Sequence, residues 1–379
     1  MTKTDVRADQ LRASGHPVFS DRKLRLGTFS SNLSYGCAIT TMDGTLKADW
    51  PSSRTLSQMA DQMDFEALVP VGRWRGFGGK TDFNGAGFEC FTWAAATGAQ
   101  TERAGIFATS HVPTIHPVLA AKQGMTIDHV SGGRFALNVV TGWHKSEIEM
   151  FGAPQLPHDQ RYEMASEWLQ IIKRLWTSDE PLSFEGRYYK VQEAVCRPRP
   201  IQRPHPVIMN AGGSEAGRHF AAKECDVAFV IPDSHEPEAM RARVDHYRQL
   251  AREEYDRELQ VWTYAYVVQG DTEQEANQYL HHYVDELGDW EAADNLVSTM
   301  GMNAQTLPPD VLTTMKRHFI GGWAGFPVVG TPAQVVEKLG QIADAGFDGC
   351  LLSWPRYVED MRSFQEQTYP LLVQAGLRG

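Results

Sequence analysis

The chain has 379 residues, of which 42% are hydrophobic and 22% are charged, and its formal net charge is −11 at pH 7. An apolar fraction of this size can bury a large core, so the composition excludes an intrinsically disordered chain. The acidic balance and the scattered Lys and Arg residues also argue against nucleic-acid binding. We therefore expect a globular protein without a nucleic-acid partner.

The N-terminal segment is polar and mixed in charge, with no apolar core of a signal peptide, and no later apolar run is long enough to cross a bilayer. The sequence therefore predicts a cytoplasmic protein with no membrane partner. The cysteines are odd in number and lack CxxC spacing, which fits reduced thiols better than disulfides or a zinc site. They are Cys37, Cys90, Cys196, Cys225 and Cys350.

Short apolar strands alternate with amphipathic helices along most of the chain, which is typical of βα units around a parallel sheet. Strands are predicted at 24–30, 65–72, 104–110, 135–142, 206–212, 226–231, 261–268 and 349–355. Helices are predicted at 55–64, 116–131, 161–176, 214–224, 237–255 and 331–346. Eight repeats favour an α/β fold of the closed (β/α)8 type, a TIM barrel, over an open doubly wound sheet.

Two segments interrupt this alternation. Residues 272–330 lie between the seventh predicted strand and its helix, where insertions into a barrel usually become lids or oligomer contacts. Residues 184–191, FEGRYYKV, predict a hairpin. We expect one TIM-barrel domain over 1–379, with an N-terminal extension at 1–22.

An asparagine stands at the centre of the fourth predicted strand, in RFALNVVTGW. Alternation places Asn138 on the face with the smaller side chains, which suits the crowded interior of a barrel. A buried amide without partners costs about 1 to 3 kcal/mol, so Asn138 must bond to protein, water or a ligand. Taken alone, a core asparagine bonded to a neighbouring strand explains it as well as a ligand contact does.

Nearby residues favour the ligand. Thr109 lies near the end of the third predicted strand, so Thr109 and Asn138 should project toward the same mouth of the barrel. Gly142 would let the backbone approach a flat ligand, and Trp143 can form one wall of its pocket.

A candidate phosphate site follows the fifth predicted strand, in NAGGSEAG. The strand ends at Gly212 and Gly213, and a helix starts at Ser214. Free N–H groups at a helix N-terminus, together with the Ser214 hydroxyl, suit a phosphate. An ordinary serine N-cap explains the same residues equally well.

Other motifs do not indicate function. The GFGGKT stretch resembles the end of a P-loop, but Trp74 replaces the first required glycine, so we expect this loop to lie over the substrate pocket instead. No GxGxxG opens a helix, and His111, His116, His281 and His282 lack metal-site spacing, so no metal is expected. Three tryptophans on helical stretches are expected in the core, namely Trp93, Trp168 and Trp176.

Together, RFALNVVTGW, HDQRYEMASEWL and VIMNAGGSEAG resemble the bacterial-luciferase-like flavin monooxygenases, especially their pyrimidine and dimethylsulfone monooxygenase branches. The resemblance runs from Arg25 to about Leu372, and RGFGGKT with Thr109 favours the pyrimidine type. It implies a TIM barrel that uses reduced FMN and O2, with FMN supplied by a separate NAD(P)H-dependent flavin reductase. It also implies a homodimer or homotetramer.

The resemblance implies that Thr109 and Asn138 lie beside the reactive edge of the flavin, with Trp143 completing the catalytic set. It implies cofactor contacts from Gly72, Arg73, Thr109, Asn138, Glu147, Arg161, Tyr162, Gly213 and Ser214. Arg161 is equally well explained as an exposed residue at a helix start. Pyrimidine enzymes tend to have an apolar residue and a lysine where Gly72 and Arg73 stand, so this pair departs from the pyrimidine pattern.

The implied activity is a two-component monooxygenase acting through a flavin peroxide on a small electron-poor substrate. Candidates are a pyrimidine or another N-heterocycle, a sulfone or sulfonate, and a halogenated aromatic. Thr109 and Asn138 are expected to act as neutral donors that stabilise an anionic peroxide without protonating it. The alternatives are an F420-dependent oxidoreductase of the same fold and a non-catalytic flavin-binding protein.

Overall fold

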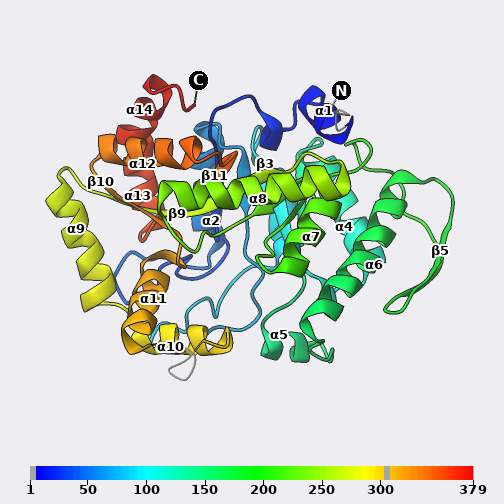
Figure 1. Ribbon diagram of the computed structural model, residues 1–379, viewed down its shortest axis with the longest axis horizontal. Helices are drawn as coiled ribbons and strands as arrows, with labels where there is room; N and C mark the ends of the chain where they lie inside the picture. Colours follow the sequence, from blue (N-terminus) through cyan, green and yellow to red (C-terminus); the bar gives the residue numbers. More distant parts are fainter. Residues whose placement is uncertain (1–5, 303–307, 379) are drawn as a thin grey trace. The chain divides into compact units, whose positions relative to one another are not determined.

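The computed structural model describes residues 6–302 and 308–378 (Figure 1). The first five residues of the expected N-terminal extension lie outside the described residues, as do residues 303–307 of the expected insertion. Within the described part, no helix combines the length and the apolar character needed to cross a membrane.

The main sheet is a closed barrel of parallel strands surrounded by helices, as the sequence predicts. Its strand order is β10-β9-β11-β1-β2-β3-β4-β7-β8, and an additional β9–β8 pairing closes it. The eight barrel strands are β1 (Arg25–Phe29), β2 (Ala67–Val69), β3 (Gly105–His111), β4 (Phe135–Val140), β7 (Val207–Asn210), β8 (Val227–Phe229), β9 (Gln260–Gln269) and β11 (Gly349–Ser353). All eight predicted strands are confirmed. One further strand, β10 (Phe326–Gly330), was not predicted.

The helices begin where the sequence supplies caps. Thr331 and Gln334 form a reciprocal capping box, and Pro332 occupies the first turn, where its missing N–H costs nothing. The six predicted helices appear with shifted ends as α2 (Trp50–Gln62), α4 (Pro117–Val130), α6 (His158–Thr177), α7 (Glu215–Glu224), α8 (Pro237–Tyr255) and α12 (Pro332–Asp344). Outside the insertion, five further α-helices of the described residues lie beyond the six predicted ranges: α1 (Val6–Ala13), α3 (Cys90–Gly98), α5 (Lys145–Met150), α13 (Tyr357–Ser363) and α14 (Tyr369–Gln374).

Contacts group the chain into two compact units. Unit 1 comprises the described residues up to Ser20 together with Glu89–Val230 and Asp245–Val261. Unit 2 comprises Asp21–Phe88, Ile231–Val244 and the described residues from Trp262 onward. The expected single domain stays a prediction.

In unit 1, β4 lies between β3 and β7 in parallel register. Thr109 pairs with Asn138, and Asn138 pairs with Met209, so these three side chains face the same side of the sheet. The predicted core tryptophans are confirmed, since Trp93, Trp168 and Trp176 are each at most 1% exposed.

The amino end of β8 in unit 1 carries a buried charge cluster. Asp226 accepts hydrogen bonds from Arg7 Nε at 3.0 Å and Arg7 Nη2 at 2.8 Å, and from Arg257 Nη2 at 3.3 Å. Arg7 also donates to the carbonyl oxygens of His205 and Pro206. Burial disfavours the carboxylate, but Arg7 and Arg257 outweigh it and hold the pKa of Asp226 well below its usual range.

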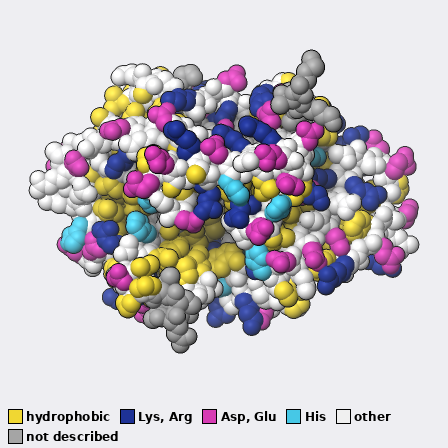
Figure 2. Space-filling model, in the orientation of Figure 1, with side chains coloured by type: hydrophobic (Ala, Val, Ile, Leu, Met, Phe, Trp, Pro, Cys, Tyr) yellow, Lys and Arg dark blue, Asp and Glu magenta, His cyan; other side chains and the backbone are white. Residues whose placement is uncertain are grey.

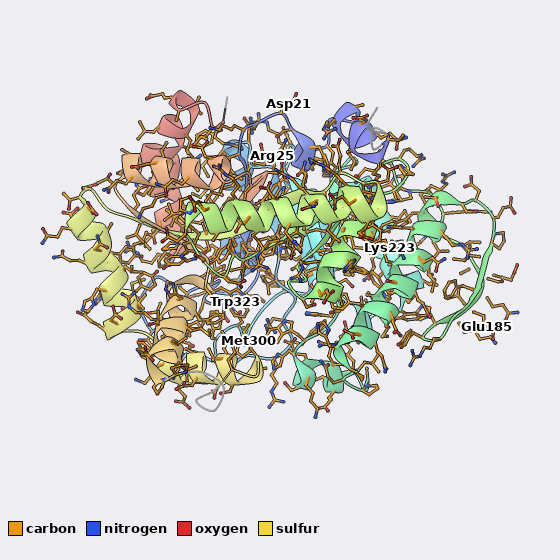
Figure 3. The ribbon with its side chains drawn as sticks, viewed as in Figure 1. Asp21, Arg25, Glu185, Lys223, Met300 and Trp323 are labelled. Atoms are coloured by element: carbon orange, nitrogen blue, oxygen red, sulfur yellow. The ribbon has the colours of Figure 1, made fainter. Side chains whose placement is uncertain are left out.

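The predicted hairpin of unit 1 is confirmed as β5 (Leu182–Glu185) paired antiparallel with β6 (Lys190–Ala194). Its turn is fixed to α6 because Glu167 accepts hydrogen bonds from three consecutive backbone N–H groups, at positions 187–189. Glu185 lies toward the outer end of this hairpin (Figure 3) and pairs with Lys190 at 2.7 Å on the surface.

Unit 2 holds a second charge cluster, at the amino end of β2. Glu66 is 2% exposed and lies 2.7 Å from Arg378 and 2.9 Å from Arg22. It also accepts a hydrogen bond from the backbone N–H of Leu26 in β1. The carboxylate therefore connects β1, β2 and the C-terminal part of unit 2.

In unit 2, β9 is followed by residues 272–330, the segment expected to be an insertion. It contains α9 (Glu273–His281), a π-helical turn (His282–Glu286), α10 (Trp290–Thr299), α11 (Pro309–Gly322) and β10. After α11, Trp323 and Ala324 both adopt left-handed backbone angles, with φ of 50° and 56°. This is a strained turn for residues with a β-carbon. Trp323 is labelled in Figure 3.

Candidate functional site

Thr109 and Asn138 form a buried polar pair in unit 1. The amide Nδ2 of Asn138 donates to Thr109 Oγ1 at 3.1 Å, and the two residues are 8% and 5% exposed. The amide Oδ1 is buried and has no hydrogen-bond partner among the described residues. The hydrogen bond to the neighbouring strand accounts for the NH2 group of the amide only. The amide oxygen therefore remains available as an acceptor. The catalytic role of the pair stays a prediction.

Gly142 follows β4 with a left-handed φ of 83°, which a residue with a side chain rarely adopts. A β-carbon there would lie 2.9 Å from Ile148 Cδ1 and 3.2 Å from Pro113 Cγ. The fold alone therefore explains this glycine, and the expected approach of a flat ligand is not needed. The Gly142 carbonyl oxygen accepts hydrogen bonds from Arg161 Nη1 at 2.7 Å and Gln155 Nε2 at 3.3 Å.

Arg161 is half-buried near the start of α6 and is held against this turn. Its Nε is buried and has no hydrogen-bond partner in the part of the chain that the structure describes. Arg161 is therefore not an exposed residue at a helix start, which was the alternative explanation. The expected contact with a cofactor stays a prediction.

Glu147 lies on α5 and is only 1% exposed. His144 Nδ1 lies 3.6 Å from its Oε1, and His144 Nε2 lies 2.9 Å from Ser146 Oγ. The Trp143 ring stacks on the imidazole of His144, with centroids 5.4 Å apart. His144 was missed from the sequence, although its spacing of three residues from Glu147 is a usable signal for contact on one helical turn.

The start of α7 packs closely against Tyr162. A β-carbon on Gly212 or Gly217 would lie 2.6 or 2.7 Å from the Tyr162 hydroxyl, whereas one on Gly213 would meet no atom within 4 Å. The turn thus has one open glycine between two crowded ones. Asn210 fixes its shape, because the amide accepts from Gly212 N at 2.8 Å and donates to the carbonyl oxygen of Val139 at 2.7 Å. Asn210 is not among the site residues predicted from the sequence.

Ser214 is the N-cap of α7, and its hydroxyl oxygen accepts from Gly217 N at 3.1 Å. The N-cap alternative is therefore observed. It leaves the hydroxyl hydrogen as a donor, so capping and phosphate binding are compatible. Phosphate binding by Ser214 and Gly213 stays a prediction.

Gly72 and Arg73 follow β2 in unit 2. The Arg73 guanidinium lies over the ring of Phe77 at 5.0 Å and over that of Trp323 at 5.9 Å. Phe83 stacks on Phe77 with centroids 6.2 Å apart. Arg73 therefore belongs to an aromatic cluster that its sequence neighbourhood did not reveal. Figure 2 shows apolar side chains gathered in a hollow beside α10 and α11, the helices that precede Trp323 in this unit.

The GFGGKT loop of unit 2 is fastened to α10. Asp289, the N-cap of that helix, accepts from Thr81 N at 2.7 Å and from Thr81 Oγ1 at 2.8 Å. Asn295 Nδ2 donates to the Phe77 carbonyl oxygen at 2.8 Å. Within unit 2 the loop thus joins the insertion to the segment after β2. Its expected position over a substrate pocket stays a prediction.

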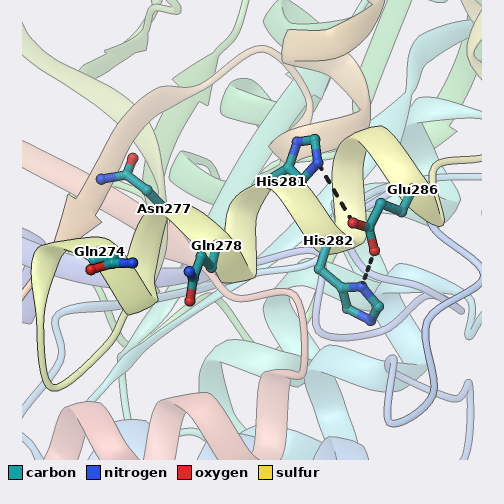
Figure 4. Close-up of a pocket in the computed structure, with 6 residues that line it drawn as sticks. All are labelled: Gln274, Asn277, Gln278, His281, His282 and Glu286. Atoms are coloured by element: carbon teal, nitrogen blue, oxygen red, sulfur yellow. Dashed lines mark hydrogen bonds and ion pairs between the residues drawn. The ribbon is translucent and has the colours of Figure 1, made fainter.

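A polar groove runs along α9 and the following π-helical turn (Figure 4). It is lined by Gln274, Asn277, Gln278, His281, His282 and Glu286. Both histidines pair with acidic residues of the same segment, including His282 with Glu286 at 2.6 Å. None of the residues expected at the site lines this groove. Among the described residues, no group of three or more His, Cys, Asp or Glu side chains could hold a metal ion, and all five cysteines are buried and free.

Comparison with known proteins identifies the family. The luciferase-like monooxygenase family matches residues 33–349, and the chain belongs to this family. It is 31% identical to the FMNH2-dependent dimethylsulfone monooxygenase of Pseudomonas putida, over 90% of this chain and 93% of the relative. It is 28% identical to the pyrimidine monooxygenase RutA of a Bradyrhizobium species, over 93% and 98%. The solved structure of DmoA from Hyphomicrobium sulfonivorans has the same fold, with a TM-score of 0.81 at 22% identity, covering 94% of this chain and 89% of that one.

The residues of unit 1 fit the flavin that the resemblance implies. Asn138 Oδ1 and Arg161 Nε are buried polar atoms without hydrogen-bond partners in the described residues, which a polar ligand would satisfy. Gly213 leaves open space beside the start of α7, where a helix N-terminus suits a phosphate. The Asn138 acceptor suits the polar edge of the flavin ring, and the Arg161 cation suits the polar ribityl chain. The start of α7 suits the phosphate.

Proposed function

We propose that this chain is the oxygenase of a two-component system. It takes reduced FMN from an NAD(P)H-dependent flavin reductase and, with O2, oxygenates or cleaves a small electron-poor substrate. The observation that carries the proposal is the neutral, buried Thr109–Asn138 pair with one amide atom unsatisfied. Membership of the luciferase-like monooxygenase family and relatives named for FMNH2 support the choice of cofactor.

In this proposal the residues of unit 1 share the work of holding the cofactor. Ser214 and the open backbone at Gly213 bind its phosphate, and Tyr162 packs against this turn. Arg161, fixed by the Gly142 carbonyl, directs its remaining donors toward polar atoms of the cofactor. These assignments use groups that the fold already holds in place, so little ordering is required on binding.

Glu147, buried beside His144, is proposed to contact a polar group of the cofactor. Trp143 stacks on His144, which restricts the indole and lets it form a wall of the pocket. Gly72 and Arg73 of unit 2 are proposed as further cofactor contacts, with Arg73 restrained by Phe77 and Trp323.

Reduced FMN, when bound, supplies the electrons that activate O2. The protein must then hold oxygen and substrate at the ring without delivering a proton too early, because early protonation releases hydrogen peroxide. Thr109 and Asn138 suit this task, since a hydroxyl and an amide form hydrogen bonds but are not acids at neutral pH.

The substrate class we propose is an N-heterocycle such as a pyrimidine, a sulfone or sulfonate, or a halogenated aromatic. Two of these classes appear in the names of relatives, dimethylsulfone and pyrimidine monooxygenase. A panel of uracil, dimethylsulfone, an alkanesulfonate and a chlorinated aromatic, assayed with reduced FMN and 18O2, tests the proposal. We expect one 18O atom per product with one panel member. If every substrate leaves all electrons in hydrogen peroxide, the oxygenase proposal is wrong for this panel.

Two alternatives make different predictions. An F420-dependent oxidoreductase of the same fold would bind the deazaflavin and show almost no oxygen reactivity when reduced. A non-catalytic flavin-binding protein would bind FMN, but substrate would not alter its oxidation. Stopped-flow spectra of the protein with reduced FMN and O2, with and without substrate, separate the three functions.

We further propose that the protein acts in the cytoplasm as a homodimer or homotetramer. Light scattering on the purified chain tests the oligomer, because a mass near 42.4 kDa would mean a monomer instead.

A further inference from the structure

The hydrogen bond between Asn138 and Thr109 determines which end of the amide is occupied. Nδ2 donates to Thr109 Oγ1 at 3.1 Å, so the NH2 group is engaged and Oδ1 points elsewhere. That oxygen is buried, in a residue only 5% exposed, and has no partner among the described residues. Asn138 therefore offers an acceptor. This differs from the expectation that both residues of the pair act as donors toward oxygen.

A buried acceptor needs a donor, because leaving it unsatisfied costs about 1 to 3 kcal/mol. Thr109 and Asn138 are register partners on the same face of the sheet, whereas Ser110 pairs with Val139 on the opposite face. The donor must therefore come from the side of the sheet that Thr109 faces.

The two redox states of FMN differ at the atom that could meet this oxygen. N5 of the oxidised ring is an imine nitrogen, which accepts hydrogen bonds and carries no hydrogen. N5 of the reduced ring is an amine with an N–H, which donates. An amide oxygen therefore attracts the reduced ring and repels the lone pair of the oxidised ring. An amide NH2 in the same place would have the opposite preference.

We propose that Asn138 selects the redox state of the cofactor: its Oδ1 accepts a hydrogen bond from N5–H of reduced FMN and disfavours oxidised FMN. This inference rests on the proposed function, because it requires FMN as the ligand. Its consequence is a cycle in which reduced FMN binds and oxidised FMN leaves for the reductase. Asn138 is then a positioning residue for the ring, and Thr109, restrained by the amide, is the donor toward oxygen.

The first test measures the dissociation constants of reduced and oxidised FMN under anaerobic conditions. Asn138→Leu keeps the branched shape of the side chain and removes the acceptor. We expect the preference of the native chain for reduced FMN to fall about tenfold in this variant, mainly because reduced FMN binds more weakly. Ser110→Ala is the matched control, since it removes a buried hydroxyl on the opposite face of the neighbouring strand and should leave the ratio unchanged.

An unchanged ratio in Asn138→Leu would overturn the inference. So would a ratio shifted further toward reduced FMN, which is the result expected if the amide NH2 faced N5. Circular dichroism of both variants shows that they are folded before the constants are compared.

The second test uses the native chain, so folding of a variant does not enter. Reduced 5-deaza-FMN has carbon in place of N5 and lacks the N–H, whereas 1-deaza-FMN retains it. We expect the native chain to bind reduced 1-deaza-FMN more tightly than the oxidised form. With 5-deaza-FMN, we expect this preference for the reduced form to be lost. Equal preference with both analogues would contradict the role of Asn138 and leave the proposed function standing. Failure to bind FMN in either redox state would overturn both.

Discussion

Within unit 1, the amino end of β8 carries a buried carboxylate, Asp226, and β4 carries a buried amide, Asn138. Both groups are at most 5% exposed. Asp226 receives hydrogen bonds from two arginines and from the backbone N–H of Ile208. Asn138 has one partner, Thr109, and its oxygen has none among the described residues.

The difference separates stability from binding. At Asp226 the charges are fully paired by groups of the same unit, so the cluster holds α1 and the chain before β7 against the sheet. At Asn138 the group is neutral and half satisfied, so it keeps the capacity to bind. Loss of the ion pairs of Asp226 should therefore lower the stability of the fold, whereas loss of the Asn138–Thr109 pair should affect only binding and reaction.

The largest effect is expected from Asp226→Asn. Removing the carboxylate charge leaves Arg7 and Arg257 buried without their counterion, which typically costs about 3 to 5 kcal/mol. Urea unfolding followed by circular dichroism measures it. Glu185→Gln is the control, because its ion pair with Lys190 is exposed and should contribute almost nothing. Equal stability of the two variants would remove the structural role given to Asp226.

Thr109→Val should leave the fold intact and change the outcome of the reaction. Loss of one preorganised donor typically raises a barrier by about 3 to 4 kcal/mol. We expect product formation to fall by roughly 100- to 1000-fold and hydrogen peroxide to account for the consumed reduced FMN. Product and peroxide are quantified per reduced FMN. A variant that keeps the native yield would show that Thr109 does not act on oxygen.

Lowering the pH should destabilise the folded state, because two buried imidazoles of unit 1 resist protonation. Burial lowers the pKa of His16 to about 4 and that of His205 to about 3. Below the usual histidine pKa of about 6.5, the unfolded chain binds protons that the folded chain does not, so the free energy of unfolding falls as pH drops from 6.5 toward 4. Urea unfolding at pH 7 and pH 5 measures this loss.

His16→Asn sharpens the test of pH dependence. His16 caps a short helix by accepting from Val18 N through Nδ1, and an asparagine oxygen can replace this acceptor without titrating. The difference in unfolding free energy between pH 7 and pH 5 should be smaller in the variant. If it is the same as in the native chain, His16 does not contribute.

The smallest effect is expected in unit 2, at Asp289, the N-cap of α10. Asp289→Asn weakens the bonds to Thr81 but retains an acceptor for the helix cap at Ala292. We expect amide hydrogen exchange in the GFGGKT loop to accelerate about tenfold with little change in global stability. Asp294→Asn, which removes only a surface pair with Lys316, is the control. Unchanged exchange would mean that Asp289 does not fasten the loop.

The barrel was predictable from the sequence because its signals are local. Apolar runs such as FALNVV, bounded by polar turns, mark a buried strand wherever they occur, and proline with threonine or histidine marks helix starts. β10 was missed because FPVVG is short and follows the GGWAG turn, whose composition indicates a loop.

The site was only partly predictable, because its details depend on contacts between distant segments. The sequence places Thr109 and Asn138 on adjacent strands, but the direction of the amide follows from a hydrogen bond across 29 positions. The supports at Asn210 and His144 looked like ordinary strand and loop residues. Likewise, no local pattern links Arg7 to Asp226, which lie 219 positions apart.

The pairing of Glu66 with Arg378 spans 312 positions and bears on the order of events during synthesis. Glu66 leaves the ribosome with Arg22 already made, but Arg378 is translated long afterward. Most of unit 1 is encoded between Glu66 and Arg378, so its strands can assemble before Arg378 is available to pair with Glu66. Completion of unit 2 is therefore a late step in folding during synthesis.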